Sequence, residues 1–355
     1  MNILDLFSGC GGISDGFRQN KFRIVGGIDF DKDSVKTFRE NFPKSDAICA
    51  DISKITNNNI SERFANRNIN IVVGGPPCQG FSNANRWQNE KNDPRNKLFF
   101  DFLRFVKIIS PQIVLLENVR GILTKDNGYA KVRIINHINK LGYKIYPTIL
   151  NASDFGVPQN RYRAFFVGIK KNILKNEFCI NEPNKSDKVT VKDAIGELYK
   201  FKHLEKVDQY NLTNKPNTNY RKYLRNSNNL ISNHQIVYPA KSTQEKIKHV
   251  KQGGNWRDIP KKMFINNRDN RHSSAYKRLC EKDVSVTIDT GNSHSNYFHP
   301  LFNRLPTVRE SARIQSFKDR FIFHGSRTSQ YRQVGNAVPP LLVKHIASKL
   351  KKLLI

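Results

Sequence analysis

One cysteine stands in the stretch GGPPCQGFS, residues 74–82, directly after the apolar run INIVV. Two glycines and two prolines precede Cys78, and such a stiffened turn holds a side chain in one position. A thiolate that must meet an electrophilic atom at one distance and angle requires this rigidity. The motif therefore indicates a nucleophilic cysteine, against the more common fate of a cysteine as a small buried hydrophobe.

A carboxylate closes a second apolar run, because Glu117 ends the segment QIVLLE. If the two runs are neighbouring parallel strands, Glu117 and Cys78 open into the same crevice. Burial beside a thiolate is expected to raise the pKa of Glu117 and to keep a proton available near neutral pH. An ion-paired strand end is the structural alternative.

Two arginines, Arg161 and Arg163, are two positions apart in QNRYR, residues 159–163. On an extended segment they share one face, where two guanidinium groups can hold a substrate oxygen and favour a thiolate. A surface strand that faces solvent is the alternative.

A glycine-rich loop, DLFSGCGG, follows the first apolar run and precedes a short helical segment. Gly9, Gly11 and Gly12 let the backbone approach a ligand closely, at the place where an α/β sheet holds a nucleotide-like molecule. The loop lacks the G-x-G-x-x-G spacing of a pyrophosphate site. It suits an adenosine with a small charged tail, so S-adenosylmethionine fits better than NAD.

Acidic and aromatic residues end the next two apolar runs. Asp29 comes 20 residues after Gly9, where a carboxylate can accept both hydroxyl groups of a ribose. Asp51 can accept from an adenine amino group, and Phe30 can stack on the ring. Helix capping is the alternative role of the two acids.

The elements that must position these residues are apolar runs alternating with amphipathic segments. Helical spacing marks residues 31–41 and 96–109. The runs predicted as strands are 2–7, 22–29, 46–52, 69–75, 112–118, 143–151 and 163–169. This alternation predicts an α/β fold, a doubly wound, mostly parallel sheet in the strand order 3-2-1-4-5 with helices on both faces.

The character of the chain changes after the last strand, and 355 residues suit a large domain with a smaller one. Residues 171–303 lack clean periodicity and predict a second, smaller, loop-rich domain. Helical spacing resumes at 305–317 and 339–355. We therefore expect a main domain over 1–170 and a C-terminal segment, 304–355, that returns to it.

The net charge is +30, from 60 basic against 30 acidic residues, and such a field attracts polyanions. Nucleic acid is the expected partner, although Lys-rich codon bias would produce a similar composition.

No basic leader or apolar stretch of about 20 residues is present, so we expect a cytoplasmic protein without a membrane partner. Five scattered cysteines argue against disulfides, and His294 and His299 have no further ligand at zinc spacing, so no metal is expected.

Five motifs together resemble the signature blocks of the DNA (cytosine-5)-methyltransferase family. They occur in family order, from residue 3 to about 345 but not in the middle segment: DLFSGCGG, GGPPCQGFS, ENV, QNRYR and QVGNAVPP. The resemblance implies methylation of cytosine C5 in a specific duplex DNA sequence, with S-adenosylmethionine as methyl donor. It also implies a stand-alone prokaryotic enzyme of a restriction-modification system, nucleoid-associated when bound to DNA.

The resemblance assigns roles to individual residues. Cys78 would add to C6 of the base, and Glu117 would bind N3 and the exocyclic amine. Arg161 and Arg163 would hold the base O2, and Asn118 would support the loop that carries the cysteine. The residues that would bind the cofactor are Phe7, Gly9, Gly11, Gly12, Asp29, Phe30, Asp51, Ile52, Pro76, Asn336 and Val338.

Attack on C6 requires the target base to leave the stacked duplex. The polar connection 80–96 is long and aperiodic, and we expect it to close over the flipped base. Residues 171–303 would then form the target-recognition domain. We expect a monomer whose cognate restriction endonuclease is not a stable subunit.

Three alternatives stay open at this stage. An RNA cytosine methyltransferase would share these blocks, but such enzymes generally have a smaller middle domain. A regulatory relative without chemistry should lack the cysteine, the glutamate or the glycines, which are all present. A cysteine hydrolase would need a histidine beside the thiol, and none occurs in the strand-end motifs near Cys78.

Overall fold

The structure is a computed structural model. It describes residues 1–77, 97–173, 177–180, 188–201, 207–225, 227, 229–264, 275–289 and 297–355, and only the backbone at 125 and 126. The chain forms two compact units. The first comprises residues 1–151, 162–183 and 342–355, and the second comprises 152–161 and 184–341.

A seven-stranded sheet in the order β3-β2-β1-β4-β5-β7-β6 forms the centre of the first unit. Strands β1 to β5 are parallel, and β7 pairs antiparallel with both β5 and β6. The seven strands are β1 (Asn2–Leu6), β2 (Arg23–Asp29), β3 (Asp46–Cys49), β4 (Ile69–Gly74), β5 (Ile113–Val119), β6 (Tyr143–Asn151) and β7 (Tyr162–Lys170). The order reverses between β1 and β4, and ligands of such sheets bind at the carboxyl ends of the strands at this point.

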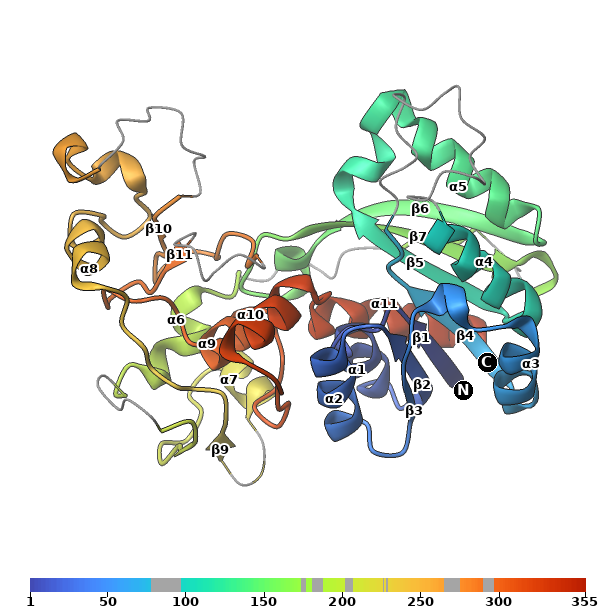
Figure 1. Ribbon diagram of the computed structural model, residues 1–355, viewed down its shortest axis with the longest axis horizontal. Helices are drawn as coiled ribbons and strands as arrows, with labels where there is room; N and C mark the ends of the chain where they lie inside the picture. Colours follow the sequence, from blue (N-terminus) through green and yellow to red (C-terminus); the bar gives the residue numbers. More distant parts are fainter. Residues whose placement is uncertain are drawn as a thin grey trace. The chain divides into compact units, whose positions relative to one another are not determined.

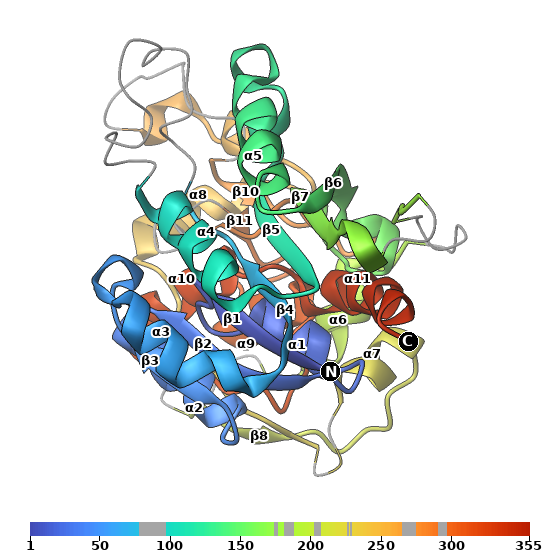
Figure 2. The ribbon, with the colours of Figure 1, turned by 90° about the vertical axis from the view of Figure 1, so that its right-hand side faces the viewer.

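Helices cover both faces of this sheet (Figures 1 and 2). They are α1 (Gly12–Arg18), α2 (Lys32–Asn41), α3 (Asn57–Phe64), α4 (Lys97–Ile109), α5 (Tyr129–Asn139) and α11 (Pro340–Leu353). The C-terminal helix docks against the end of α1, where the amide of Asn20 donates to the Lys344 carbonyl over 2.6 Å. The Lys351 ammonium returns a bond to the Asn20 carbonyl.

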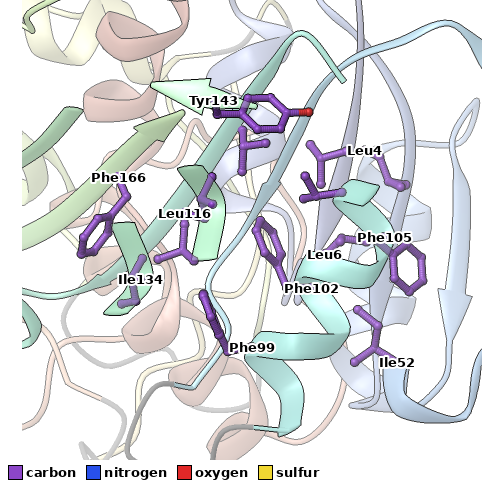
Figure 3. Close-up of a cluster of buried hydrophobic side chains, with 14 of the residues drawn as sticks. Leu4, Leu6, Ile52, Phe99, Phe102, Phe105, Leu116, Ile134, Tyr143 and Phe166 are labelled. Carbon is purple, nitrogen blue, oxygen red and sulfur yellow. The ribbon is translucent and has the colours of Figure 1, made fainter. Parts of the chain in front are cut away.

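The period of the strands and helices decides which side chains form the core. Leu4 and Leu6 point from β1 to the face covered by α3, α4 and α5, where Phe99, Phe102 and Phe105 are fully buried (Figure 3). The alternating residues, Ile3 and Asp5, point to the opposite face because successive strand side chains alternate. Asp5 is therefore a carboxylate on a buried face.

The second unit consists of short elements and loops. Its helices and strands are α6 (Val191–Ile195), α7 (Asn219–Leu224), α8 (Lys241–Lys248), α9 (Val308–Ile314), α10 (Arg327–Asn336), β8 (Tyr210–Asn211), β9 (Leu230–Ile231), β10 (Lys277–Arg278) and β11 (Tyr297–Phe298). Every residue of α9 is buried, although the helix carries Arg309, Glu310 and Arg313. A helix buried on all sides is a core element of its unit.

Each buried charge of α9 has partners. Glu310 accepts two bonds from Arg304, at 2.7 and 2.9 Å, and Arg313 makes two bonds with Asp319. Arg309 donates to backbone carbonyls, including that of Ser232. Buried charges are tolerated when they are paired and hydrogen-bonded in this way.

The predicted fold class and strand order are confirmed, and all seven predicted strands are present. The compact units divide the chain at other positions than our expected functional domains, since residues 304–341 lie in the second unit. The functional division into 1–170, 171–303 and 304–355 stays a prediction. Among the described residues, no helix has the length and apolar character needed to cross a bilayer.

Candidate active site

Glu117 lies near the carboxyl end of β5, where its side chain is 14% exposed. The strand before it in the sheet, β4, ends at Gly74, and Gly75 follows. A Cβ at position 75 would lie 3.0 Å from Glu117 Oε2, so only glycine lets the chain pass beneath the carboxylate without displacing it. The carboxyl group is therefore held directly against the segment that leads to Cys78.

Arg163 faces Glu117 across the antiparallel pair of β5 and β7. Val119 is the register partner of Arg163, and Glu117 is therefore its diagonal neighbour on the same face. The Nε of Arg163 lies 3.0 Å from Oε1 of Glu117. Burial lowers the pKa of Arg163 from its ordinary value, whereas the charge of Glu117 and its hydrogen bond oppose that change. The ion pair fixes the direction of the carboxylate.

Asn118 ties β5 to the segment that follows β4. Its side-chain amide donates to the Pro76 carbonyl over 3.0 Å. Support of the loop that carries Cys78 stays a prediction. Pro76 is buried and Pro77 is exposed. Cys78 and the polar connection 80–96 lie outside the described residues.

The glycine-rich loop between β1 and α1 has an unusual backbone. Phe7 has φ 59°, Gly9 has φ 51° and Gly11 has φ 99°, which is the left-handed region that favours glycine. A Cβ at Gly11 would lie 2.5 Å from the Phe42 ring, whereas at Gly9 it would meet no atom within 4 Å. The loop is thus packed closely at Gly11 and open at Gly9, where a ligand can approach the backbone.

Asp29 holds this loop from the end of β2. Its Oδ2 accepts from the Gly9 amide at 2.8 Å and its Oδ1 from the Asp31 amide at 2.9 Å. Burial raises the pKa of Asp29, and the two amide bonds oppose the change. Each carboxylate oxygen keeps a second lone pair for a ligand hydroxyl.

The ends of β2 and β3 complete this edge of the first unit. Phe30 exposes 76% of its surface, which leaves its ring free to cover a planar ligand. Asp51 accepts from the Ser53 amide at 3.0 Å, a bond that lowers its pKa, so the capping alternative applies to this acid. The Ile52 side chain belongs to the hydrophobic core (Figure 3), and its contact with a cofactor stays a prediction.

The sequence profile of the C-5 cytosine-specific DNA methylases matches residues 1–352. The chain belongs to this family. The enzyme methylates C5 of cytosine, and the roles predicted for Cys78, Glu117 and the two arginines stay predictions.

Relatives and solved structures resemble this methylase over nearly its whole length. The type II methyltransferase M1.HphI of Haemophilus parahaemolyticus is 36% identical over 99% of this chain and 87% of its own, and M.DdeI of Desulfomicrobium norvegicum is 34% identical over 99% and 88%. A prophage-encoded putative DNA modification methyltransferase of E. coli has a TM-score of 0.80 at 29% identity, covering 100% and 99% of the two chains. The Dnmt2 methyltransferase of S. pombe, at 18% identity and a TM-score of 0.63, shares the fold.

Arg161 has a different environment in this methylase from that of Arg163. It belongs to the second unit and is 1% exposed, so the alternative of a solvent-facing strand is wrong for it. Its guanidinium donates to the carbonyls of Ile288 at 2.9 Å and Gly335 at 2.6 Å. These bonds join distant segments of the second unit, and the contact of Arg161 with a base stays a prediction.

The motif QVGNAVPP also lies in the second unit. Asn336 ends α10 and is exposed, whereas Val338 is 5% exposed. The side-chain amide of Gln315 donates to the carbonyls of Val334 and Ala337, which fixes this turn. Helix α11 begins at Pro340, directly after this turn, and the cofactor contacts of Asn336 and Val338 stay predictions.

Sequence reasoning missed two features of the site. One is Gly75, whose lack of a side chain makes room for Glu117; the doubled glycine was the available signal. The other is the full burial of the side chain of Asp5, the first residue of the motif DLFSGCGG. For metals, the described residues contain no group of three or more ligating side chains, His299 is buried with Nδ1 accepting from two backbone amides, and His294 lies outside them.

Proposed function

We propose that this methylase transfers a methyl group from S-adenosylmethionine to cytosine C5 in duplex DNA through a covalent bond between Cys78 and C6 of the base. The observation that carries the proposal is the Glu117 carboxylate, paired with Arg163 at 3.0 Å and seated over Gly75. Cys78 follows Gly75 by three positions. An anionic nucleophile and an oriented carboxyl group would thus meet the same pyrimidine ring.

The residues would act in a fixed order. The Cys78 thiolate adds to C6, and Glu117 binds N3 and the exocyclic amine, so that negative charge does not accumulate on the ring. Arg163 orients the carboxylate during this addition. After C5 has gained the methyl group it loses its proton, the sulfur–C6 bond breaks, and Cys78 is restored as a thiolate.

The described residues at the edge of the sheet fit the proposed cofactor. Asp29 offers carboxylate oxygens to ribose hydroxyls, the open backbone at Gly9 admits the methionine portion, and the exposed Phe30 ring suits an adenine face. Bound S-adenosylmethionine would supply a sulfonium methyl group, an electrophile that carries a positive charge.

The biological setting follows from the relatives. The printed names of M1.HphI and M.DdeI are those of type II methyltransferases, which supports a role in restriction-modification with a separate endonuclease. The net charge of +30 suits duplex DNA as substrate. Access to C6 requires base flipping, and the connection 80–96 would close over the flipped cytosine. We further expect a cytoplasmic monomer that associates with the nucleoid through DNA.

A duplex containing 5-fluorocytosine at the target position tests the adduct. The fluorine cannot leave as a proton does, so the protein should become covalently attached to DNA when S-adenosylmethionine is present. The shifted band should be stable in denaturing gels. The target site would first be mapped by bisulfite sequencing of a plasmid methylated in vivo.

Cys78→Ala is the matched variant, because it removes the sulfur and leaves the DNA-binding surface intact. It should bind the duplex and form no covalent band. Methyl transfer by Cys78→Ala at the wild-type rate, or failure of the wild-type protein to become trapped, would overturn the mechanism.

A further inference from the structure

Asp5 is a buried carboxyl group that the proposed chemistry does not use. It is the fourth residue of β1, and its exposed fraction is 0%. In the sheet register it lies between Gly27 of β2 and Val73 of β4. Neither neighbour offers a polar side chain, so the carboxyl group stands on an apolar stretch of the sheet. Asp5 is also the first residue of the motif DLFSGCGG, four positions before Gly9.

The hydrogen bonds of Asp5 are few. Its Oδ2 accepts from the Ser14 hydroxyl at 2.7 Å, and Ser14 lies on α1, the helix that follows the loop. Its Oδ1 is buried and accepts no hydrogen bond from a described residue. An ionised carboxylate in such a place normally has two or three donors or a cation, and among the described residues no cation pairs with Asp5.

The charged groups around Asp5 do not supply that cation. Asp29 on β2 is negative, and Cys10 in the loop is a buried thiol whose own pKa is raised by burial. On α1, Asp15 is paired with Arg18. Burial raises the pKa of Asp5 to about 7. The hydroxyl and backbone hydrogen bonds from Ser14 lower this pKa, and the negative charge of Asp29 raises it further.

We propose that Asp5 is a positioning group which loses its proton when a cationic methyl donor binds over the loop, and which thereby favours the donor over the uncharged-sulfur product. The inference rests on the proposed use of S-adenosylmethionine. The donor carries a sulfonium, an ammonium and a carboxylate, whereas S-adenosylhomocysteine lacks the sulfonium charge. A positive charge brought into a site of low dielectric stabilises a nearby anion.

The exchange is balanced in atoms and charge. The Asp5 carboxyl group releases one proton to solvent and becomes a carboxylate, and no other bond changes. After methyl transfer the ligand has lost its positive sulfur, so Asp5 takes a proton back and the site returns to its neutral form. The reprotonated site no longer attracts the ligand, which favours product release.

Calorimetry in two buffers of different ionisation enthalpy measures this proton directly and needs no methyl transfer. At pH 7 the wild-type protein should release roughly half a proton more with S-adenosylmethionine than Asp5→Asn does. The ammonium group of the ligand titrates equally in both proteins, so the difference isolates Asp5. With S-adenosylhomocysteine the difference should fall to near zero.

The affinity for S-adenosylmethionine gives a second readout. Between pH 6 and pH 8 it should rise about tenfold more in the wild-type protein than in Asp5→Asn, since a proton must leave on binding. Glu62→Gln removes one carboxylate at an exposed position of α3 and serves as the matched control. It should keep the wild-type proton release and the wild-type pH slope.

Three outcomes would overturn the inference. They are equal proton release by wild type and Asp5→Asn, equal release with donor and product, and a pH slope that Asp5→Asn retains. If Asp5→Asn unfolds, Ser14→Ala takes its place: with one donor fewer, the carboxyl group should hold its proton more tightly, and the rise in affinity should move to higher pH. Absence of any binding of S-adenosylmethionine to folded wild-type protein would instead refute the proposed function.

Discussion

Arg163 and Glu117 are diagonal neighbours across β5 and β7, with 3.0 Å between Nε and Oε1. Both side chains are mostly buried, and a charge-assisted hydrogen bond there has a preferred geometry. The pair orients the Glu117 carboxylate before any base arrives. Its second oxygen, Oε2, lies 3.0 Å from the position of a Cβ at Gly75. The direction of the carboxylate is thus set by β7 and by the segment after β4, and the binding of a base in this direction stays a prediction.

Removal of the Arg163 side chain should release the Glu117 carboxylate from this orientation and leave the protein folded. We expect Arg163→Ala to lower kcat roughly 100-fold, by analogy with the loss of one aligned donor at a reacting centre, with a smaller loss in Arg163→Lys. Single-turnover methylation measures the effect. Arg67→Ala, at an exposed ion pair of the same unit, should retain wild-type kcat, and an equal loss in both variants would contradict the assigned role.

A methyl group at position 75 tests how much the position of the Glu117 carboxylate matters, because it would contact Oε2. Gly75→Ala places Cβ 3.0 Å from Glu117 Oε2, whereas Gly121→Ala meets no atom within 4 Å. The first substitution should displace the carboxylate by a few tenths of an ångström and lower kcat about tenfold, with little change in Tm. The second should leave both quantities unchanged. Matching kcat values for the two variants would show that the position of the carboxylate is not critical.

Asn118 should matter for the approach of the cysteine. Asn118→Ala removes the 3.0 Å hydrogen bond to the Pro76 carbonyl and should cost about 1 kcal/mol of stability. The rate of covalent trapping on 5-fluorocytosine DNA should fall further than the stability loss explains, because the chain before Cys78 is no longer held. The affinity for S-adenosylmethionine should not change. A loss of cofactor affinity with normal trapping would place Asn118 in another role.

The sequence predicted the sheet well because its signals are local. Each strand of the first unit is an apolar run of its own, and the strand order follows from the crossover rule for such runs. Glu117 could likewise be placed at a strand end from its position in LLENV. The pairing of Glu117 with Arg163 could not, since it depends on the antiparallel insertion of β7 beside β5.

The second unit was harder to predict for a physical reason. Helical spacing over 305–317 predicted the helix that contains α9, but α9 is buried on every side and yet carries three charged residues. The spacing of apolar residues could not show that the charged face is buried as well. The partners of Arg161, at Ile288 and Gly335, lie far along the chain. The burial of a charged side chain can therefore be recognised only from the three-dimensional structure, which shows its partners.

The buried titratable side chains of the second unit predict that the stability of the fold decreases in acid. Burial lowers the pKa of His234 to about 3, while an unfolded histidine keeps its ordinary value. The neutral ring therefore stabilises the fold fully above pH 6.5, and this stability is lost as the pH falls from 6.5 toward 3. Burial alone would raise the pKa of Glu310, but the charges and hydrogen bonds of Arg304 and His299 together outweigh burial and hold that pKa well below the usual range. The contribution of Glu310 to stability is therefore lost at still lower pH.

Urea unfolding at pH 7.5, 6.5 and 5.5 tests this expectation. Asp5 has a raised pKa of about 7 and takes up its proton in the same range, so the effect of the histidine is isolated by comparison with His234→Gln. Between pH 6.5 and 5.5 the wild-type free energy of unfolding should fall by about 1 kcal/mol relative to that of His234→Gln. His234→Gln should be less stable at pH 7.5 and should lose less on acidification. Glu310→Gln leaves Arg304 without its partner and should lose about 3 kcal/mol at every pH above 5. The same change between pH 6.5 and 5.5 in the wild-type protein and in His234→Gln would mean that His234 is not held neutral by its burial.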